Sequence, residues 1–284
     1  MNASATLLEA ILNMLQKKMI DSSSNYYLPN LLKQLNNPNI NPYIVEGSWT
    51  LDNLSGDSIT TGADQICIQA TPDKYYPDSG ISSSPPQIVL SSIQVNGLIN
   101  ALPEKPNVTD PNSDAPKVSV VVDFCTITDN QIPSTITVSG NFTLSQSCCI
   151  PDNVTQLCNA SSAKFGTDGD GTFSAVISPK TSQLKMNCNA VITVQPDSSF
   201  LVTVSSLEAI IPNTALTISV TIDSAGKGDK KTYEKLAEEA LNSDGAKTQI
   251  LKQLQEQLSS QSALSQISKM ITDQLNNVFQ QTFF

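Results

Sequence analysis

The sequence feature that most constrains the fold is a strict alternation of apolar and polar residues in long segments of the chain. In the segment 134–149, apolar side chains fall on one side of an extended chain, and Ser, Thr and Asn fill the other side. A strand with this period has one buried face and one face in water. Hydroxyl and β-branched side chains also suit a pleated surface. The apolar positions are Ile136, Val138, Phe142 and Leu144 here, and Leu216, Ile218, Val220 and Ile222 in a second such segment.

The alternation extends from about Tyr43 to Asp223 and is interrupted repeatedly by turn residues, as in the segments 165–171 and 196–199. Such punctuation between period-2 segments predicts a long antiparallel β section. Several strands are longer than usual, so we expect a tall, strongly twisted sheet. The predicted strands are 43–51, 65–70, 87–99, 117–128, 134–146, 171–178, 183–195, 199–211 and 215–223.

Helical periodicity appears at both ends of the chain. The segment 4–19 predicts an amphipathic helix, and 28–37 a second short one with Pro29 near its start. At the C-terminus we expect a helix over 232–241 and a long one over 246–282, with one apolar stripe. Burying that stripe is worth roughly 12 to 24 kcal/mol before entropy, so this helix must pack lengthwise on the β section. The stripe is Leu251, Leu254, Leu258, Leu264, Ile267, Ile271, Leu275 and Val278.

These elements predict an α+β protein whose 284 residues form a single elongated domain. Its parts are N-terminal helices in 1–36, an antiparallel β meander in 43–223 and C-terminal helices in 228–284. The hydrophobic content of 39% is enough for a proper core.

Charge composition excludes several functions. The formal net charge is -10, every basic residue is Lys, and the chain has no His. Arg supplies bidentate phosphate and guanine contacts, so nucleic-acid binding is not expected. An acidic chain is repelled by anionic lipid surfaces, so any contact with a membrane should be apolar.

No run of residues approaches the roughly 18 apolar positions needed to span a bilayer, and no export signal is visible. The location of the protein therefore stays open. Three alternatives remain: an export signal was removed from the sequence, the protein leaves the cell by another route, or it stays inside the cell.

No residue constellation identifies a reaction, and we expect neither an enzyme nor a cofactor. A serine hydrolase or a reactive thiol would need a base such as His. Asp168 and Asp170 in 165–173 could offer oxygens to calcium, but the other ligands of an EF-hand loop are missing, and a hairpin turn explains the segment equally well. We therefore expect no metal site.

The six cysteines have no zinc-like spacing. In one interpretation they are small buried hydrophobic residues, and Cys188 fits it because this residue falls on the apolar side of its predicted strand. Alternatively, Cys148 or Cys149 pairs with Cys158 and closes a short loop in an oxidising compartment.

The long helix against tall strands defines a contact that is apolar along its whole length, and three interpretations compete. In the first, the helix fills the contact, and the protein is a structural or adhesive module with a closed core. In the second, a slot remains beside the helix for an elongated apolar ligand. In the third, the protein is a β pore-forming or insecticidal toxin subunit, in which 117–144 forms a membrane hairpin.

The order of helix, long β meander and C-terminal helix, with the phrase "IVLSSIQVNGL" at Ile88 to Leu98, resembles the tubular lipid-binding superfamily. This group includes juvenile-hormone-binding and takeout-like proteins, mite group 7 allergens, bactericidal permeability-increasing proteins and accessory proteins of bacterial neurotoxin clusters. The resemblance implies a highly curved antiparallel sheet wrapped around a long helix, with apolar ligands between them. Unlike the insect members, the chain has no N-terminal cysteine pair and no visible signal peptide. These departures count against a secreted hormone carrier and favour a bacterial, toxin-associated accessory protein at least equally.

We therefore expect non-enzymatic binding of a lipid or another apolar small molecule, with a membrane or a partner protein as further partners. Selectivity should follow ligand length and shape. The resemblance assigns Val89, Ile93 and Val95 to a wrapping strand. The other residues expected to contact ligand are Ile136, Val138, Phe142, Leu144, Leu216, Ile218, Val220, Leu254, Leu258, Ile267 and Ile271.

Overall fold

The computed structural model describes residues 3–30, 42–71, 80–97, 101–110, 113, 115–123, 136–151, 163–177, 185–212, 216–226 and 228–283. The helices are α1 (Ala3–Ile20), α3 (Asp57–Ala70), α4 (Lys230–Asn242), α5 (Asp244–Leu258) and α6 (Gln261–Phe283). The strands are β1 (Tyr43–Ile44), β2 (Ser48–Leu51), β3 (Ser82–Ser83), β4 (Gln87–Asn96), β5 (Leu102–Pro103), β6 (Asn107–Thr109), β7 (Lys117–Asp123), β8 (Ile136–Ile150), β9 (Ala163–Ile177), β10 (Lys185–Val194), β11 (Phe200–Ile210) and β12 (Leu216–Ala225).

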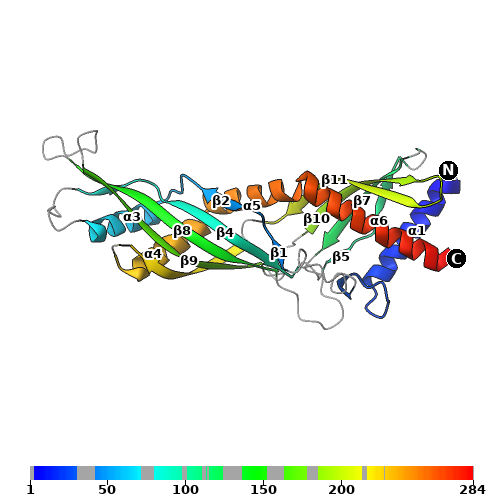
Figure 1. Ribbon diagram of the computed structural model, residues 1–284, viewed down its shortest axis with the longest axis horizontal. Coiled ribbons are helices and arrows are strands. Elements are labelled where there is room, and N and C mark those ends of the chain that lie inside the picture. The colour runs from blue at the N-terminus through cyan, green and yellow to red at the C-terminus, as the bar shows by residue number, and fades with distance from the viewer. Residues whose placement is uncertain are drawn as a thin grey trace.

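The described strands form two antiparallel sheets. Sheet A has the order β1-β4-β8-β9-β12, with β2 also paired to β4 and β3 to β8. Sheet B has the order β11-β10-β7-β5, with β6 also paired to β7. Figure 1 shows an elongated molecule with sheet A, α3 and α4 at one end, and sheet B, α1 and α6 at the other. The expected α+β class, with long twisted antiparallel strands and helices at both ends of the chain, is confirmed.

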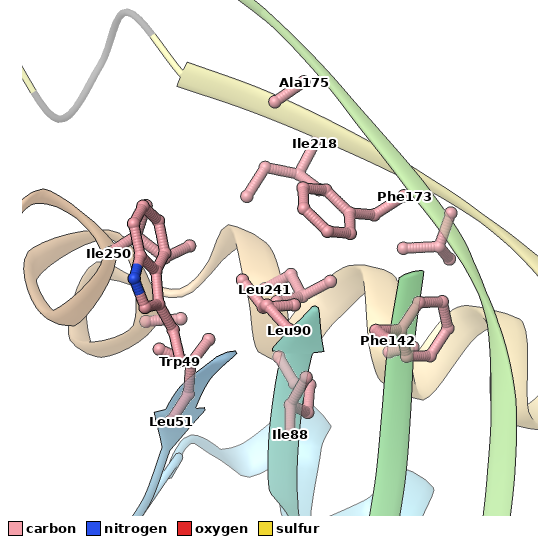
Figure 2. Close-up of a cluster of buried hydrophobic side chains, with 14 of the residues drawn as sticks. Trp49, Leu51, Ile88, Leu90, Phe142, Phe173, Ala175, Ile218, Leu241 and Ile250 are labelled. Atoms are coloured by element: carbon pink, nitrogen blue, oxygen red, sulfur yellow. The ribbon is translucent and has the colours of Figure 1, made fainter. Parts of the chain in front are cut away.

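Sheet A carries the larger apolar core, which we call cluster A. Its inner face is lined by alternate residues of β4, β8, β9 and β12, and α3, α4 and α5 supply the opposite wall. Figure 2 shows Phe142, Phe173 and Ile218 from the strands facing Leu241 of α4, with Trp49 of β2 beside Ile250 of α5. A disulfide between Cys67 of α3 and Cys148 of β8 ties the helix to the sheet.

Sheet B carries a second core, cluster B, which is built from α1, β7, β10, β11 and α6. The ring of Phe200 meets that of Phe279 edge-on, with centroids 5.0 Å apart. The Gln16 side chain of α1 also donates a hydrogen bond to the Pro103 carbonyl (3.0 Å), which fixes α1 to β5. The fully buried members are Leu8, Ile11, Leu12, Val118, Cys188, Ala190, Ile192, Phe200, Val202, Val204, Leu207 and Leu275.

The C-terminal helical segment is divided, where the sequence predicts one helix over 246–282. Ser243 caps α5, because its hydroxyl accepts a hydrogen bond from the Ala246 amide (3.2 Å). Ser260 does the same for α6, with the Ala263 amide as donor (3.3 Å). Serine side chains satisfy the free amides of a first helical turn, so each of these positions favours a new helix over continuation.

Two predicted local structures are wrong. The segment 65–70 is the last part of α3, not a strand, because the residues that α3 buries follow a helical period that begins at Ile59. The segment 165–171 lies inside β9, not in a turn. The segment carries glycines because β12 and α4 approach it closely. A Cβ on Gly171 would lie 2.0 Å from the Thr221 carbonyl oxygen of β12, and a Cβ on Gly169 would lie 2.8 Å from the Tyr233 ring of α4.

The hairpin on which the toxin interpretation depended is not formed. β7 pairs with β10, β5 and β6 in sheet B, whereas β8 pairs with β4, β9 and β3 in sheet A. The two strands that would have crossed a membrane together therefore belong to different sheets.

Candidate functional site

Most of the predicted ligand-contacting residues lie in cluster A. The even-numbered residues of β8, and those of β12 from Leu216 to Ile222, share the inner face of sheet A, as the alternation predicts. The buried members are Ile93, Val95, Ile136, Phe142, Leu144, Leu216, Ile218 and Val220, and Val138 and Leu254 pack against them partly buried.

Val89 points to the other face of sheet A. Register with β8 shifts between Ser91 and Gln94, and Ser92 has a positive φ of 51°, as expected for a β-bulge. The extra residue reverses the alternation, so Ile88 and Leu90 precede the bulge on the inner face, while Ile93 and Val95 follow it there. A strand of constant parity would have put Val89 together with Ile93, and only the bulge separates them.

Most of the predicted ligand-contacting residues of cluster A are buried by neighbouring side chains. Leu144 is 0% exposed and Ile218 is 2% exposed. The helix that packs on β12 is α4, whose Tyr233, Leu236 and Leu241 are all 0–1% exposed. The last helix, α6, packs on β11 of sheet B instead. The structure therefore does not bring β8, β12 and α6 together around one groove.

Apolar side chains stay partly exposed between α6 and sheet B, and we call this region the seam. Leu258, Ile267 and Ile271, all predicted ligand contacts, pack against cluster B without being fully buried. Among the described side chains of α6, Leu275 and Val278, both toward the C-terminal end, are the most buried, at 1% exposed. The seam is formed by Leu258, Leu264, Ile267 and Ile271 on the helices and by Val120 and Met186 on the sheet.

Met186 connects the seam to cluster A, because it packs partly buried against both clusters. Its neighbour in β7, Val122, and Met270 of α6 pack partly buried against cluster A. The incompletely covered apolar side chains thus continue from the seam to the junction of the two sheets.

Polar side chains of α6 hold the helix along the free edge of β11. Asn276 donates to the Phe200 carbonyl (2.8 Å) and accepts from the Phe200 amide (2.7 Å). Thr272 accepts from the Val202 amide (2.9 Å) and donates to its carbonyl (3.3 Å), and Ser268 accepts from the Val204 amide (2.8 Å). These side chains satisfy backbone groups that an edge strand otherwise leaves unpaired.

Carboxamide side chains of α4 and α5 make the same kind of contact with other strands. Asn242 of α4 accepts from the Ile218 amide (3.0 Å) and donates to its carbonyl (2.7 Å) at the edge of β12. Gln249 of α5 makes the same pair of bonds with Asp52, at 3.0 and 2.9 Å. Gln255 accepts from the Ala209 amide (2.9 Å) and donates to the Leu207 carbonyl (2.6 Å). The helices are thus attached to strand edges of both sheets by uncharged groups.

Two hollows on the described part of the surface are open to solvent. One lies at the β10–β11 turn, where Pro196, Phe200 and Leu201 meet Thr272 and Asn276 of α6. The other lies on the outer face of sheet A, over the bulge of β4, and is lined mainly by Ser, Thr, Asn and Gln. The first hollow thus lies where α6 meets the edge strand β11, and the second lies on the face of sheet A that is turned away from its helices.

The cysteines are used as covalent ties and as core. Cys67 and Cys148 form a disulfide, and Cys149 is disulfide-bonded as well, whereas the predicted partner Cys158 lies outside the described residues. Cys188 is a buried free thiol in cluster B, as the alternation predicts. Burial raises the pKa of this thiol to about 11, so it stays neutral and unreactive.

Among the described residues, no group of His, Cys, Asp and Glu side chains is arranged to hold a metal ion. Asp170 instead accepts a hydrogen bond from the Ser224 hydroxyl. None of the helices formed by the described residues is long and apolar enough to cross a bilayer.

No family model and no curated protein matches the sequence. Among solved structures, Takeout 1 of Epiphyas postvittana is similar over 71% of this chain and 91% of its own, with 12% identity and a TM-score of 0.29. A lipopolysaccharide binding protein is similar over 78% of this chain, with 11% identity and a TM-score of 0.25, and the match spans 41% of that protein's length.

Proposed function

We propose that the protein binds a lipid or another elongated apolar molecule in the seam between α6 and sheet B, without catalysing a reaction. The observation that carries this proposal is a set of partly buried apolar side chains where α5 and α6 meet sheet B. Leu258, Leu264, Ile267 and Ile271 of the helices pack against cluster B, as do Val120 and Met186 of the sheet, and none of the six is fully buried. An alkyl chain lying in the seam would remove that surface from water.

The chemistry of the seam favours a ligand without charge along its length. The charged residues of α6, Lys269 and Asp273, lie on its exposed side. Its polar residues nearest the sheet, such as Ser268 and Thr272, are already engaged with β11. Recognition would therefore rest on desolvation and shape, with few polar contacts.

Magnitudes set a lower limit on the length of the ligand. Each methylene removed from water contributes about 0.8 kcal/mol. Association costs about 4 to 15 kcal/mol in lost freedom, so roughly 10 buried methylenes are needed before binding becomes favourable. We expect chains of about 14 to 18 carbons to bind and chains of about 8 carbons not to bind.

Binding can be tested with saturated fatty acids of increasing length, followed by displacement of an environment-sensitive fluorescent fatty acid and by native mass spectrometry. The wild-type protein should bind the long chains. Ile267→Trp, which fills the seam, should weaken binding at least about tenfold. Ser265→Trp, on the exposed side of the same helix, should leave binding unchanged.

Two results would overturn the proposal. One is a delipidated wild-type protein that binds no chain of any length while keeping its cooperative unfolding. The other is equal binding by Ile267→Trp and the wild-type protein. Release of a dye from liposomes by oligomers would favour the toxin interpretation instead.

A further inference from the structure

Trp49 of β2 carries a buried hydrogen-bond donor that has no acceptor. The residue is 3% exposed, and its indole N–H has no partner in the described part of the chain. Nearly all buried polar groups in folded proteins are hydrogen-bonded, because water no longer reaches them. Figure 2 shows the indole nitrogen on the side of the ring that faces α5, away from Leu241 and Leu90. The unused donor thus lies toward α5 and not toward the apolar interior of cluster A.

Three glutamines form one row along α5 and face the chain around β2. At one end of the row, Gln249 bonds the Asp52 amide and carbonyl at 3.0 and 2.9 Å. At the other end, Gln257 donates to the Glu46 carbonyl at 3.4 Å. Positions four residues apart share one face of a helix, so Gln253, in the middle of the row, faces the same stretch of chain.

Gln253 comes level with Trp49 in this contact. Trp49 is three residues from each of the two bonded positions around β2, as Gln253 is four residues from each of the bonded glutamines. Ile250, one turn before Gln253, lies beside the Trp49 ring in Figure 2. The Gln253 side chain is partly buried and forms no hydrogen bond with the other described residues. Two unpaired polar groups therefore occupy the same level of the contact between α5 and β2.

These two groups lie at one end of the seam. Leu254, next to Gln253, packs partly buried against cluster A, and Leu258, one turn further, belongs to the seam. The five residues from Gln253 to Leu258 rise about 7.5 Å along the helix. An apolar chain in the seam therefore has polar groups close to its end nearest sheet A.

The surroundings favour a neutral hydrogen-bond acceptor. The charged residues beside Gln253 in α5, Lys252 and Glu256, pair with each other at 3.9 Å on the exposed side of the helix. The Glu46 side chain is exposed as well. A carboxylate that leaves water without a cationic partner is strongly disfavoured, whereas a carbonyl oxygen is satisfied by one or two N–H donors.

Resting on the lipid binding proposed above, we propose that Trp49 and Gln253 form the polar end of the site. The indole N–H and the carboxamide NH2 donate to the carbonyl oxygen of an ester or another neutral acyl lipid, whose chain lies in the seam. The ligand is thereby oriented, with its carbonyl group toward sheet A and its chain along α6. An ionised fatty acid can use the seam for its chain, but it keeps its carboxylate in water.

The test compares two ligands in the full chain, the methyl ester of a saturated fatty acid of about 16 carbons and the alkane of equal length. Trp49→Phe removes the N–H and keeps an aromatic ring, and Gln253→Met removes the amide and keeps an unbranched side chain. Gln266→Met, on the exposed side of α6, is the control. Displacement of the fluorescent fatty acid gives the ratio of the two affinities, which cancels any loss of packing that affects both ligands.

Trp49→Phe and Gln253→Met should each lower the ratio of ester affinity to alkane affinity at least about fivefold, and Gln266→Met should leave it unchanged. An unchanged ratio in either variant would overturn the proposal, and so would an equal decrease in the control. A wild-type protein that binds neither ligand contradicts the proposed function itself. Binding of both ligands with an unchanged ratio removes only the polar end and leaves binding in the seam intact.

The orientation of the ligand can be measured in the wild-type protein, because Trp49 is its single tryptophan. Bromine atoms quench indole fluorescence at close range. The methyl ester brominated next to its carbonyl group should therefore quench Trp49 more strongly than the ester brominated at the far end of its chain. Equal quenching by the two esters, or stronger quenching by the second, would overturn the proposal.

Discussion

The Asn276 carboxamide faces the Phe200 peptide with both of its polar atoms, donating at 2.8 Å and accepting at 2.7 Å. Replacing Asn276 with Asp keeps the shape and removes the donor, so a carboxylate oxygen would face the Phe200 carbonyl. We expect a loss of about 1 to 3 kcal/mol in the free energy of unfolding at pH 7, measured with urea. Asn277→Asp adds the same charge at an exposed position and should cost less than about 0.5 kcal/mol.

The loss in Asn276→Asp should shrink below about pH 4, because a protonated carboxyl group regains a donor. A deficit that does not change with pH would contradict this explanation.

The glycines of β9 should differ sharply in their tolerance of a methyl group. Gly171→Ala places a Cβ 2.0 Å from a backbone oxygen, which can move only if β9 and β12 separate. We expect a loss of at least about 3 kcal/mol or failure to fold. Gly166→Ala, in the same strand, meets nothing closer than 3.9 Å and should change stability by less than about 1 kcal/mol. Thermal unfolding of the two variants tests this, and similar melting temperatures would show that β9 and β12 are not held so closely.

The Cys67–Cys148 disulfide closes a loop of 81 residues in sequence. In the chain-entropy description, such a closure stabilises the folded state by about 4 kcal/mol. The double variant Cys67→Ala and Cys148→Ala should lose roughly 2 to 5 kcal/mol in urea unfolding. Cys188→Ala removes a buried sulfur without removing a covalent tie, so it should cost less. A double variant as stable as Cys188→Ala would contradict a stabilising role for the bond.

Cys188 should make stability depend on pH in alkaline solution. Burial raises its pKa from an ordinary 9.0 to about 11, so the folded state disfavours the thiolate. The unfolded chain loses this proton first, and the stabilisation present below about pH 9 is lost as the pH rises toward 11. Desolvation of Tyr43 and Tyr233 raises the pKa of each phenol, which adds a change of the same sign. Unfolding of Cys188→Ala between pH 8 and 11 should therefore show a smaller decrease than the wild type, and equal decreases would exclude the thiol as a contributor.

Alternation was a sound guide wherever the sheet stayed regular. It placed Ile136, Phe142, Leu144 and the apolar residues of β12 on one buried face. The resemblance assigned Val89, Ile93 and Val95 to one strand, and all three lie in β4, but the bulge at Ser92 puts Val89 on the opposite face from the other two. Nothing in the residue types around Ser92 marks this bulge.

The assignment of 165–171 failed for a different reason. Glycine and aspartate are typical of turns, but here the glycines serve the contacts of β9 with Tyr233 and with the backbone of β12, which are visible only in the folded chain.

The apolar stripe of the C-terminal segment was recognised, but its partners were not. Ser268, Thr272 and Asn276 read as a solvated face, because hydroxyl and amide side chains at helical spacing give no sign that a strand edge lies beside them. Sequence therefore predicted that the last helices pack along the β part, and could not predict that α4 covers sheet A while α6 covers sheet B.

The hydrogen bonds that Asn242, Gln249, Gln255, Ser268, Thr272 and Asn276 make to strand backbones involve only uncharged groups that do not titrate near neutrality. The Lys230 ammonium, which donates to the Asp223 carbonyl, adds one charged contact. Between about pH 5 and 8, and from low to high ionic strength, we expect the hydrogen bonds made by the uncharged side chains to keep their strength. Within that pH range, the docking of the C-terminal helices through these groups would thus be insensitive to acidity and salt.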